Sequence, residues 1–225
     1  DVIWINTELF ANQFKRVYQF RLVLKGTKPP SWRRIQVPDN YSFENLHVAI
    51  QNVMDWEVCA GSSYNFQVIN PSTGLIDKIG CLCFGFSRFA GINEPVIRIA
   101  DYFSPRNTSA SYRSQHETRW SFSIEFEKVL FADKFEIYPI CVKGKRASPP
   151  EDCGGVEKYQ EMLETINESN SGKDGKALNL YQNFFEDDFD PGYFAPDDVF
   201  FTAGSGNPAL PDDLPDRLMK ILKEL

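Results

Sequence analysis

The side chains of this 225-residue chain with the greatest chemical potential are five cysteines, two histidines and two groups of basic residues. Nucleophilic catalysis requires a Cys or Ser beside a base that a third group orients. His47 falls in an apolar helical pattern and His116 in a polar stretch, and the sequence suggests no such partner for either. Because a lone histidine is more often a packed or surface residue than a catalyst, we predict no catalytic residues and no enzyme activity.

The cysteine spacing is a weak signal for a metal site. One residue separates Cys81 from Cys83, whereas zinc sites favour about two to four residues between paired ligands. Both thiols would still share one face of a strand, and Cys141 and Cys153 could complete a set of four ligands. Small buried hydrophobic residues are the favoured interpretation, so we predict no metal and no cofactor. The odd total, with Cys59 as the fifth, favours the reduced thiols of an intracellular protein.

Two short segments, SWRRI and KGKR, carry the basic clusters. Alternation along a strand would place Arg33 and Arg34 on opposite faces, so one of them must meet the core or a carboxylate. An ion pair with the acidic tail, through Glu151 or Asp152, is the favoured interpretation. A clamp for a phosphate or carboxylate ligand is the alternative, because the guanidinium fork binds such groups bidentately.

Aromatic residues make up 14% of the chain. Aromatic and arginine side chains dominate binding hot spots, so we expect a binding surface built from tryptophans and the basic clusters. The predicted binding residues are Trp32, Arg33, Arg34, Trp56, Trp120, Lys145 and Arg146.

Alternating apolar and polar residues predict the strands that would position these side chains. Residues 17–24 and 31–37 alternate on either side of a Gly-Thr-Lys-Pro-Pro turn, and residues 120–129 show the clearest pattern. Such alternation is typical of an antiparallel sheet with one solvated face. Weaker patterns predict further strands at 63–69, 75–79, 95–99 and 135–141.

One helix is predicted among these strands. Ser42 can cap it, and residues 43 to about 54 carry apolar side chains at helical spacing. We expect this helix to pack on one face of the sheet. Residues 103–117 are rich in Ser and Arg and lack periodicity, so they predict a loop.

The C-terminal third differs from the rest in charge. Residues 1–146 hold 18 Lys and Arg against 14 Asp and Glu, a net charge of +4, whereas residues 147–225 hold 6 against 17, a net charge of −11. An acidic surface does not favour nucleic acid or an anionic membrane, and a solvated face is the simplest interpretation. No apolar run reaches the roughly 20 residues of a membrane span, so we expect no membrane partner.

Helical patterns recur in this acidic part. We predict helices at 156–166, 176–185 and 215–225, a flexible linker at 167–176, and an irregular segment, EDDFDPGYFAPDDVFF, that wraps over the domain. The predicted layout is an N-terminal extension at 1–13, an α+β domain at 14–200 and a tail helix at 201–225. Within the domain, the part from 146 to 200 is expected to be acidic and helical.

Three segments of the chain resemble a known family. They are VYQFRLVLKGTKPPSWRRIQVPDNYSFENLHVAIQNVMDW at 17–56, WSFSIEFEKV at 120–129 and YPICVKGKRASPPEDCGG at 138–155. In order and spacing, over about residues 14–200, the chain resembles the Ri-plasmid open-reading-frame-three-like family, whose members include TnpR-type passenger proteins of insertion elements. The resemblance implies an α+β domain without an assigned activity, and its mobile-element association hints at nucleic acid.

The chain departs from this family where relatives carry histidines. Members commonly have a His-x-His-like segment after the Trp that ends the first helix, whereas here EVCAGSSYNF follows Trp56. Members also have a Tyr-Asp-Phe-Gly-Asp-x-Trp-x-His strand, in which this chain keeps Trp120 and has Phe122 in place of the His. The resemblance therefore implies that a polar site of the relatives is largely lost here.

Together these patterns predict an α+β fold, with a mainly antiparallel sheet of five to seven strands, one helix packed on a face and a helical, acidic C-terminal extension. The function we expect is that of a non-catalytic protein-binding module, intracellular (cytoplasmic or nuclear) and part of a larger protein or complex. The alternatives are a nucleic-acid-binding domain associated with mobile elements and a degenerate enzyme or metal-binding fold.

Overall fold

The computed structural model describes residues 14–58, 63–81, 96–114, 120–133, 136–170 and 189–202. Its centre is a seven-stranded sheet in the order β4-β3-β5-β6-β1-β2-β7, and every neighbouring pair is antiparallel. The strands are β1 Arg16–Leu24, β2 Trp32–Pro38, β3 Tyr64–Ile69, β4 Ile76–Cys81, β5 Ser109–Ser114, β6 Ser121–Phe131 and β7 Ile140–Lys145. The predicted α+β class and antiparallel sheet are confirmed.

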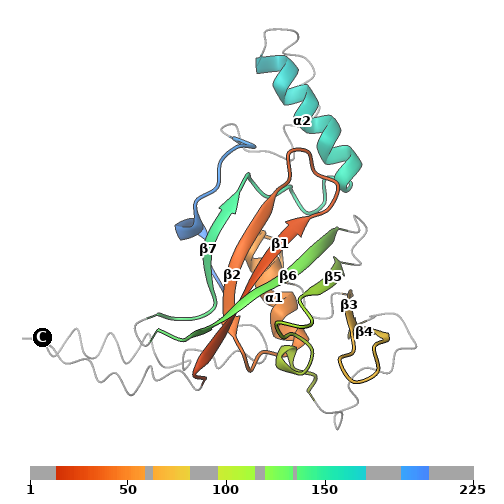
Figure 1. The fold of residues 1–225 in the computed structure, drawn as a ribbon. Coiled ribbons are helices and arrows are strands. Elements are labelled where there is room, and N and C mark those ends of the chain that lie inside the picture. Colours follow the sequence, from red (N-terminus) through yellow and green to blue (C-terminus); the bar gives the residue numbers. More distant parts are fainter. Residues whose placement is uncertain are drawn as a thin grey trace, which may run out of the picture.

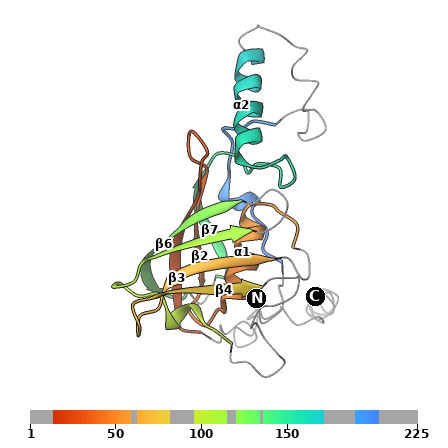
Figure 2. The ribbon, with the colours of Figure 1, turned by 90° about the vertical axis from the view of Figure 1, so that its right-hand side faces the viewer.

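Helix α1, Phe43–Val53, packs on one face of this sheet (Figure 1). We call the face toward α1 the inner face and the opposite face the outer face; Figure 2 shows the two sides of the sheet from its edge. Alternate residues of β1 and β6, among them Phe20, Phe122 and Phe126, point inward and are buried. In β6 the residues between these, Ser123 and Glu125, are exposed, as the alternation predicts.

Helix α1 begins and ends as its sequence predicts. The Ser42 hydroxyl accepts a 3.1 Å hydrogen bond from the N–H of Asn45, and the Asn45 side chain accepts a 3.0 Å bond from the N–H of Ser42. This reciprocal capping box satisfies two N–H groups at the helix start. Met54 caps the other end, and Asp55 reverses the chain with a φ of 55°.

Strand β5 lies where a loop was predicted, and that prediction is wrong. Its sequence, SASYRS, contains one large apolar side chain, Tyr112, so local periodicity gave little signal. The strand forms because its backbone pairs with β3 on one side and β6 on the other, which places Tyr112 between Phe66 and Phe122. Tertiary pairing here overrides weak local preference.

Two other predicted strands differ in the structure. In the described part of 95–99, Arg98 forms only an isolated bridge with Ser42, and Ile99–Asp101 forms a 3₁₀ turn. The strand predicted at 135–141 is displaced to Ile140–Lys145. It begins after Pro139, which has no N–H to donate to a strand partner.

The acidic part contains one described α-helix, α2, which spans Val156–Asn170 and rises beyond the end of the sheet (Figures 1 and 2). It is longer than predicted, so the first residues of the expected linker are helical. The helices predicted at 176–185 and 215–225, and the extension at 1–13, lie outside the described residues. No helix of the described ranges has both the length and the apolar character needed to cross a membrane.

Residues 189–202, which we call the strap, run beside β7 (Figure 1, blue). They are irregular except for a 3₁₀ turn at Pro196–Asp198. The N–H of Ala147 donates to the carbonyl of Pro191 at 3.2 Å, and the N–H of Thr202 donates to the Asn52 side chain of α1 at 3.1 Å. The predicted wrapping of an irregular segment over the domain is confirmed for these residues.

Candidate binding site on the outer face

The seven predicted binding residues divide between the two faces of the sheet. Arg33, Trp56 and Trp120 are only 1%, 5% and 1% exposed. The two indole rings stack with centroids 5.5 Å apart, and their N–H groups donate 2.8 Å hydrogen bonds to the carbonyls of Pro149 and Glu151. The expectation that these three residues form an exposed surface is wrong, because their contacts lie inside the fold.

Arg33 is a buried cation, and among the described residues it pairs with no carboxylate. The ring of Phe194 in the strap covers it, 3.8 Å from the guanidinium carbon. Burial lowers the pKa of Arg33 to about 10, so it stays protonated at neutral pH. The predicted ion pair with Glu151 or Asp152 is wrong for Arg33, because its guanidinium hydrogen bonds to neutral oxygens and not to a carboxylate. The guanidinium donates to the carbonyls of Val53 (3.2 Å), Trp32 (3.0 Å) and Lys145 (3.2 Å) and to the hydroxyl of Ser148 (2.8 Å).

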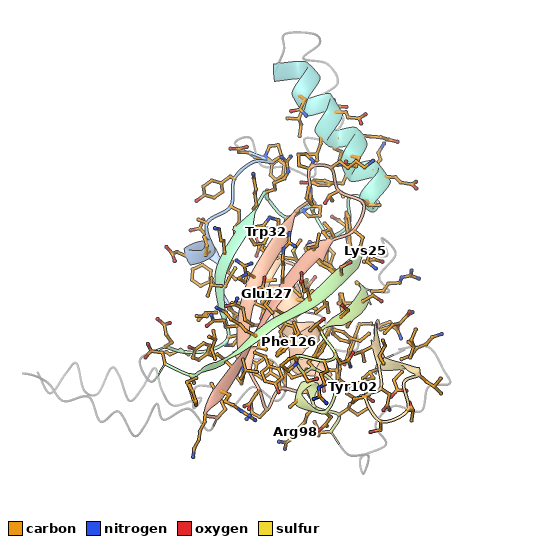
Figure 3. The ribbon with its side chains drawn as sticks, in the orientation of Figure 1. Lys25, Trp32, Arg98, Tyr102, Phe126 and Glu127 are labelled. Carbon is orange, nitrogen blue, oxygen red and sulfur yellow. The ribbon has the colours of Figure 1, made fainter. Side chains whose placement is uncertain are left out.

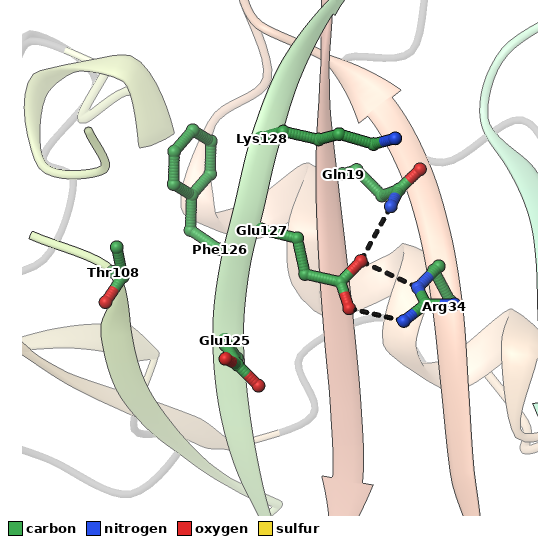
Figure 4. A pocket seen from close by; sticks show the side chains of 7 residues that line it. All are labelled: Gln19, Arg34, Thr108, Glu125, Phe126, Glu127 and Lys128. Atoms are coloured by element: carbon green, nitrogen blue, oxygen red, sulfur yellow. Dashed lines mark hydrogen bonds and ion pairs between the residues drawn. The ribbon is translucent and has the colours of Figure 1, made fainter. Parts of the chain in front are cut away.

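Arg34, on the outer face, is the arginine that binds a carboxylate. Its Nε and Nη2 each donate a 2.6 Å hydrogen bond to Glu127 of β6, and Gln19 of β1 donates another at 2.6 Å (Figure 4). Gln36 in turn donates to Gln19 at 2.9 Å. The carboxylate that pairs with Arg34 therefore belongs to a strand of the same sheet and not to the acidic C-terminal part.

The electrostatics of this network keep it charged. Burial raises the pKa of Glu127, but the hydrogen bonds from Arg34 and Gln19 outweigh burial and hold that pKa below its ordinary value. The hydrogen bond to Glu127 raises the pKa of Arg34. Both partners are ionised at neutral pH, and the bidentate geometry fixes the direction of the guanidinium.

Trp32 lies beside Arg34 on the outer face, two residues earlier in β2 (Figure 3). Its ring centroid is 5.4 Å from the guanidinium carbon of Arg21 and 5.6 Å from that of Arg34. Both distances fall within the reach of a cation–π interaction, about 6 Å. The half-buried indole therefore forms an apolar surface bordered by two positive charges.

Basic residues stand opposite one another across three strands at this place. The register pairs Arg21 of β1 with Arg34 of β2, and Arg34 with Lys143 of β7. In the next row, Trp32 pairs with Lys145. We call these five residues the Trp32 patch. Like charges directly opposite each other destabilise a sheet. This row of cations therefore lowers the stability of the sheet, and forming the sheet does not require it.

Two carboxylates of β6 neutralise the Trp32 patch in part. Glu127 holds Arg34, and Glu125 lies 3.8 Å from Arg21. No ion pair of the described residues involves either lysine of the patch. Four cations against two carboxylates leave a surplus of two positive charges. Beside the patch lies an open hollow of about 640 Å³, which Gln19, Thr108 and Lys128 also line.

The structure thus brings Trp32, Arg34 and Lys145 together. Arg146 directly follows β7, with a φ of 72°, and is not part of the Trp32 patch. The sequence patterns missed Arg21 as a member of the site, and they placed Lys143 in a basic cluster without including it among the predicted binding residues. Alternation alone indicates that Arg21 faces solvent, but only the strand register shows that it lies opposite Arg34. The alternation within each strand shows which residues face solvent, and the site becomes visible only when the strand register is known.

A polar chain crosses the inner face between α1 and β5. His47 Nδ1 lies 2.8 Å from the Tyr112 hydroxyl, which donates to Gln51 at 3.3 Å; Gln51 donates to Glu151 at 3.4 Å. Burial raises the pKa of Tyr112 well above its ordinary value, and His47 stacks on Tyr64 with ring centroids 4.0 Å apart. These side chains form a packed polar network, and His47, Gln51 and Tyr112 within it are buried.

The described thiols are poorly suited to chemistry. Burial raises the pKa of both Cys141 and Cys153 to about 11, which leaves little thiolate at neutral pH. Within the ranges that the structure describes, no three His, Cys, Asp or Glu side chains gather to hold a metal ion. Cys59, Cys83 and the side chain of Cys81 fall outside those ranges.

Comparisons with known proteins agree with this fold. A solved structure, a protein of unknown function, MM3350, from Methanosarcina mazei Go1, is similar with a TM-score of 0.71 and 40% sequence identity, over 84% of this chain and 100% of that one. No curated protein matches the chain. The family model described as plasmid pRiA4b ORF-3-like protein matches residues 16–198. The chain therefore belongs to the plasmid pRiA4b ORF-3-like family.

Proposed function

We propose that the chain is a non-catalytic protein-binding module, acting inside the cell within a larger protein or complex, and that its contact surface is the outer face around the Trp32 patch. The observation that carries this proposal is the patch itself, an apolar ring bordered by cations. Tryptophan and arginine dominate the energetics of protein interfaces. The Glu127 carboxylate fixes Arg34 in advance, so less conformational entropy is lost on binding.

The arrangement of charge supports a binding role over a purely structural one. Arg21, Arg34 and Lys143 oppose one another directly, and such pairs lower the stability of a sheet. Places where a sequence gives up local stability are often functional sites. A partner that brings negative charge would remove this repulsion when it binds.

Affinity purification from the protein's own cells, followed by mass spectrometry, tests the proposal. We expect one stoichiometric protein partner with the wild-type chain and its loss with Trp32→Ala, because the apolar centre of the surface is removed. Phe131→Ala is the matched control, since this aromatic residue is 88% exposed and lies at the opposite end of the β1–β6 strand pair. Retention of the same partner by Trp32→Ala would contradict the proposal.

Nucleic-acid binding is the second candidate, and the row of cations is the observation that favours it. Glu125 and Glu127 border the same row and would repel a phosphate backbone. Binding of single-stranded RNA or DNA would have to weaken steeply between about 50 and 200 mM salt, because phosphate contacts release counterions. Flat binding over that range, or none, would exclude this candidate.

A further inference from the structure

We propose further that the partner presents an acidic, extended segment whose alternate carboxylates bind Lys143 and Lys145. This inference rests on the proposed function and names the chemistry of the partner. It commits the outer face to one kind of ligand, a negatively charged stretch of protein lying along β7.

The first support is the charge that remains free after the internal pairs are formed. Arg34 is held at 2.6 Å by two hydrogen bonds to Glu127, so a ligand carboxylate would have to displace that partner. Lys143 and Lys145 are both exposed, and no ion pair among the described residues involves them. Their ammonium groups can therefore bind a ligand without breaking any ion pair formed within the described residues.

The second support is the spacing of the two lysines. They are two residues apart in β7 and oppose Arg34 and Trp32 respectively, so both side chains project from the outer face. A strand rises about 3.3 Å per residue, which separates the two by about 7 Å. Alternate side chains of an extended peptide have the same separation and also share one face. A Glu-x-Glu or Asp-x-Asp segment thus matches the pair.

The backbone that carries these lysines is held from beneath. Gly144 lies between them and points to the inner face, where the Phe194 ring packs so closely that a Cβ would overlap it. Phe194 in turn stacks on Arg33 at 3.8 Å. The strap and the buried arginine hold this part of β7 in place. The side chains of Lys143 and Lys145 therefore extend from a rigid backbone.

The neighbouring carboxylates limit where on the outer face an acidic ligand can lie. Glu125 and Glu127 on β6 would repel an acidic ligand from the middle of the sheet and confine it to the side of β2 and β7. The half-buried ring of Trp32, opposite Lys145, supplies an apolar contact on that side. Nucleic-acid affinity comes mainly from neutralising phosphates along the backbone, and two free lysines beside two carboxylates suit a short acidic peptide better.

Fluorescence anisotropy with labelled peptides tests the inference. The probe is a twelve-residue peptide with Glu at every second position and Thr between, and its counterpart has Gln in place of Glu. We expect the Glu peptide to bind the wild-type chain and to lose about tenfold or more in affinity with the double variant Lys143→Glu, Lys145→Glu. Lys78→Glu is the matched control, because Lys78 is an exposed lysine of β4, and it should bind as the wild type does.

Several outcomes would overturn the inference. Equal binding of the Gln peptide, or unchanged affinity in the double variant with an unchanged circular dichroism spectrum, would show that the lysines do not recognise carboxylates. Tighter binding of a twelve-nucleotide single-stranded RNA that depends on the same lysines would assign the site to nucleic acid.

The failures of the two proposals are distinguishable. If Trp32→Ala abolishes partner capture while the double lysine variant retains it, the protein-binding function stands and the acidic segment is excluded. If the lysines bind the Glu peptide while the partner is retained by Trp32→Ala, the Trp32 patch is not the surface that this partner uses.

Discussion

Arg33 and Arg34 are neighbours in β2, and the two faces of the sheet use them in opposite ways. Arg33 enters the inner face, is 1% exposed and donates to neutral oxygens. Arg34 lies on the outer face and binds the carboxylate of Glu127. The buried arginine thus has no counter-ion among the described residues, whereas the more exposed one has a bidentate partner.

The inner face around Arg33 thus contributes to stability, whereas the outer face around Arg34 carries an excess of positive charge. The hydrogen bonds of Arg33 join the end of α1, through Val53, to the end of β7, through Lys145, and Phe194 brings the strap to the same guanidinium. On the outer face, by contrast, the register sets cations against one another and two lysines remain unpaired within the described residues. The inner face should therefore govern folding and the outer face binding.

The largest effect that would test this comparison is expected from Arg33→Ala. It would take the guanidinium donor from one buried carbonyl, that of Val53, and from two partly buried ones, and it would remove the cation beneath Phe194. Unsatisfied buried groups cost about 1–3 kcal/mol each, partly offset by relaxation, so we expect a loss of about 3–5 kcal/mol in the free energy of unfolding. Urea denaturation measures it. Arg34→Ala is the matched control, and a larger loss there would reverse the comparison.

Gly144→Ala is expected to have the next largest effect. The added Cβ would overlap the Phe194 ring, so either the strap or β7 must shift, at a cost of about 1–3 kcal/mol typical of overpacking. Adding Phe194→Ala makes room for the methyl group. A double-mutant cycle should then show coupling between the two sites; strictly additive losses would mean that the strap does not press on β7.

Glu127→Gln is expected to cost about 1 kcal/mol at neutral pH, since the bidentate pair is partly exposed and screened by solvent. The pKa of Glu127 is lower in the folded chain than its ordinary value, so the stabilisation is complete above the unfolded pKa, about 4.3. It is lost as the pH falls through the folded pKa. Wild type and variant should therefore converge below about pH 4, and a constant difference down to pH 2 would contradict the ionic contribution.

Local sequence patterns are sufficient for much of the fold. The alternation in β1, β2 and β6 and the Ser42 cap of α1 each reflect one element and its immediate neighbours. Strand β5 could not be predicted this way, because SASYRS owes its conformation to backbone pairing with β3 and β6. Periodicity reports which face an element buries, and it is silent for a polar strand held by partners far along the chain.

The candidate site was predictable in part for the same reason. Alternation correctly placed Arg33 and Arg34 on opposite faces, but the partner of Arg34 lies 93 residues away in β6. The charge of the acidic C-terminal part made it the expected partner, whereas the carboxylate that binds Arg34 belongs to β6. Likewise, the geometry of the neutral acceptors around Arg33 depends on where α1 ends at Val53 and β7 ends at Lys145, which no local pattern specifies.

The smallest effect is expected from Lys143→Gln, and it is the sharpest test of the outer face. If Lys143 only opposes Arg34, its neutralisation should leave the free energy of unfolding unchanged or raise it by up to about 0.5 kcal/mol. Salt should remove any gain, because near 1 M the Debye length falls to about 3 Å. Lys78→Gln is the matched control, since this exposed lysine pairs with Gln67 and has no cation opposite it. A clear loss of stability in Lys143→Gln alone would make the lysine a structural residue. Of the two lysines of the Trp32 patch, only Lys145 would then remain as a free charge, and the distinction between the two faces of β2 would weaken.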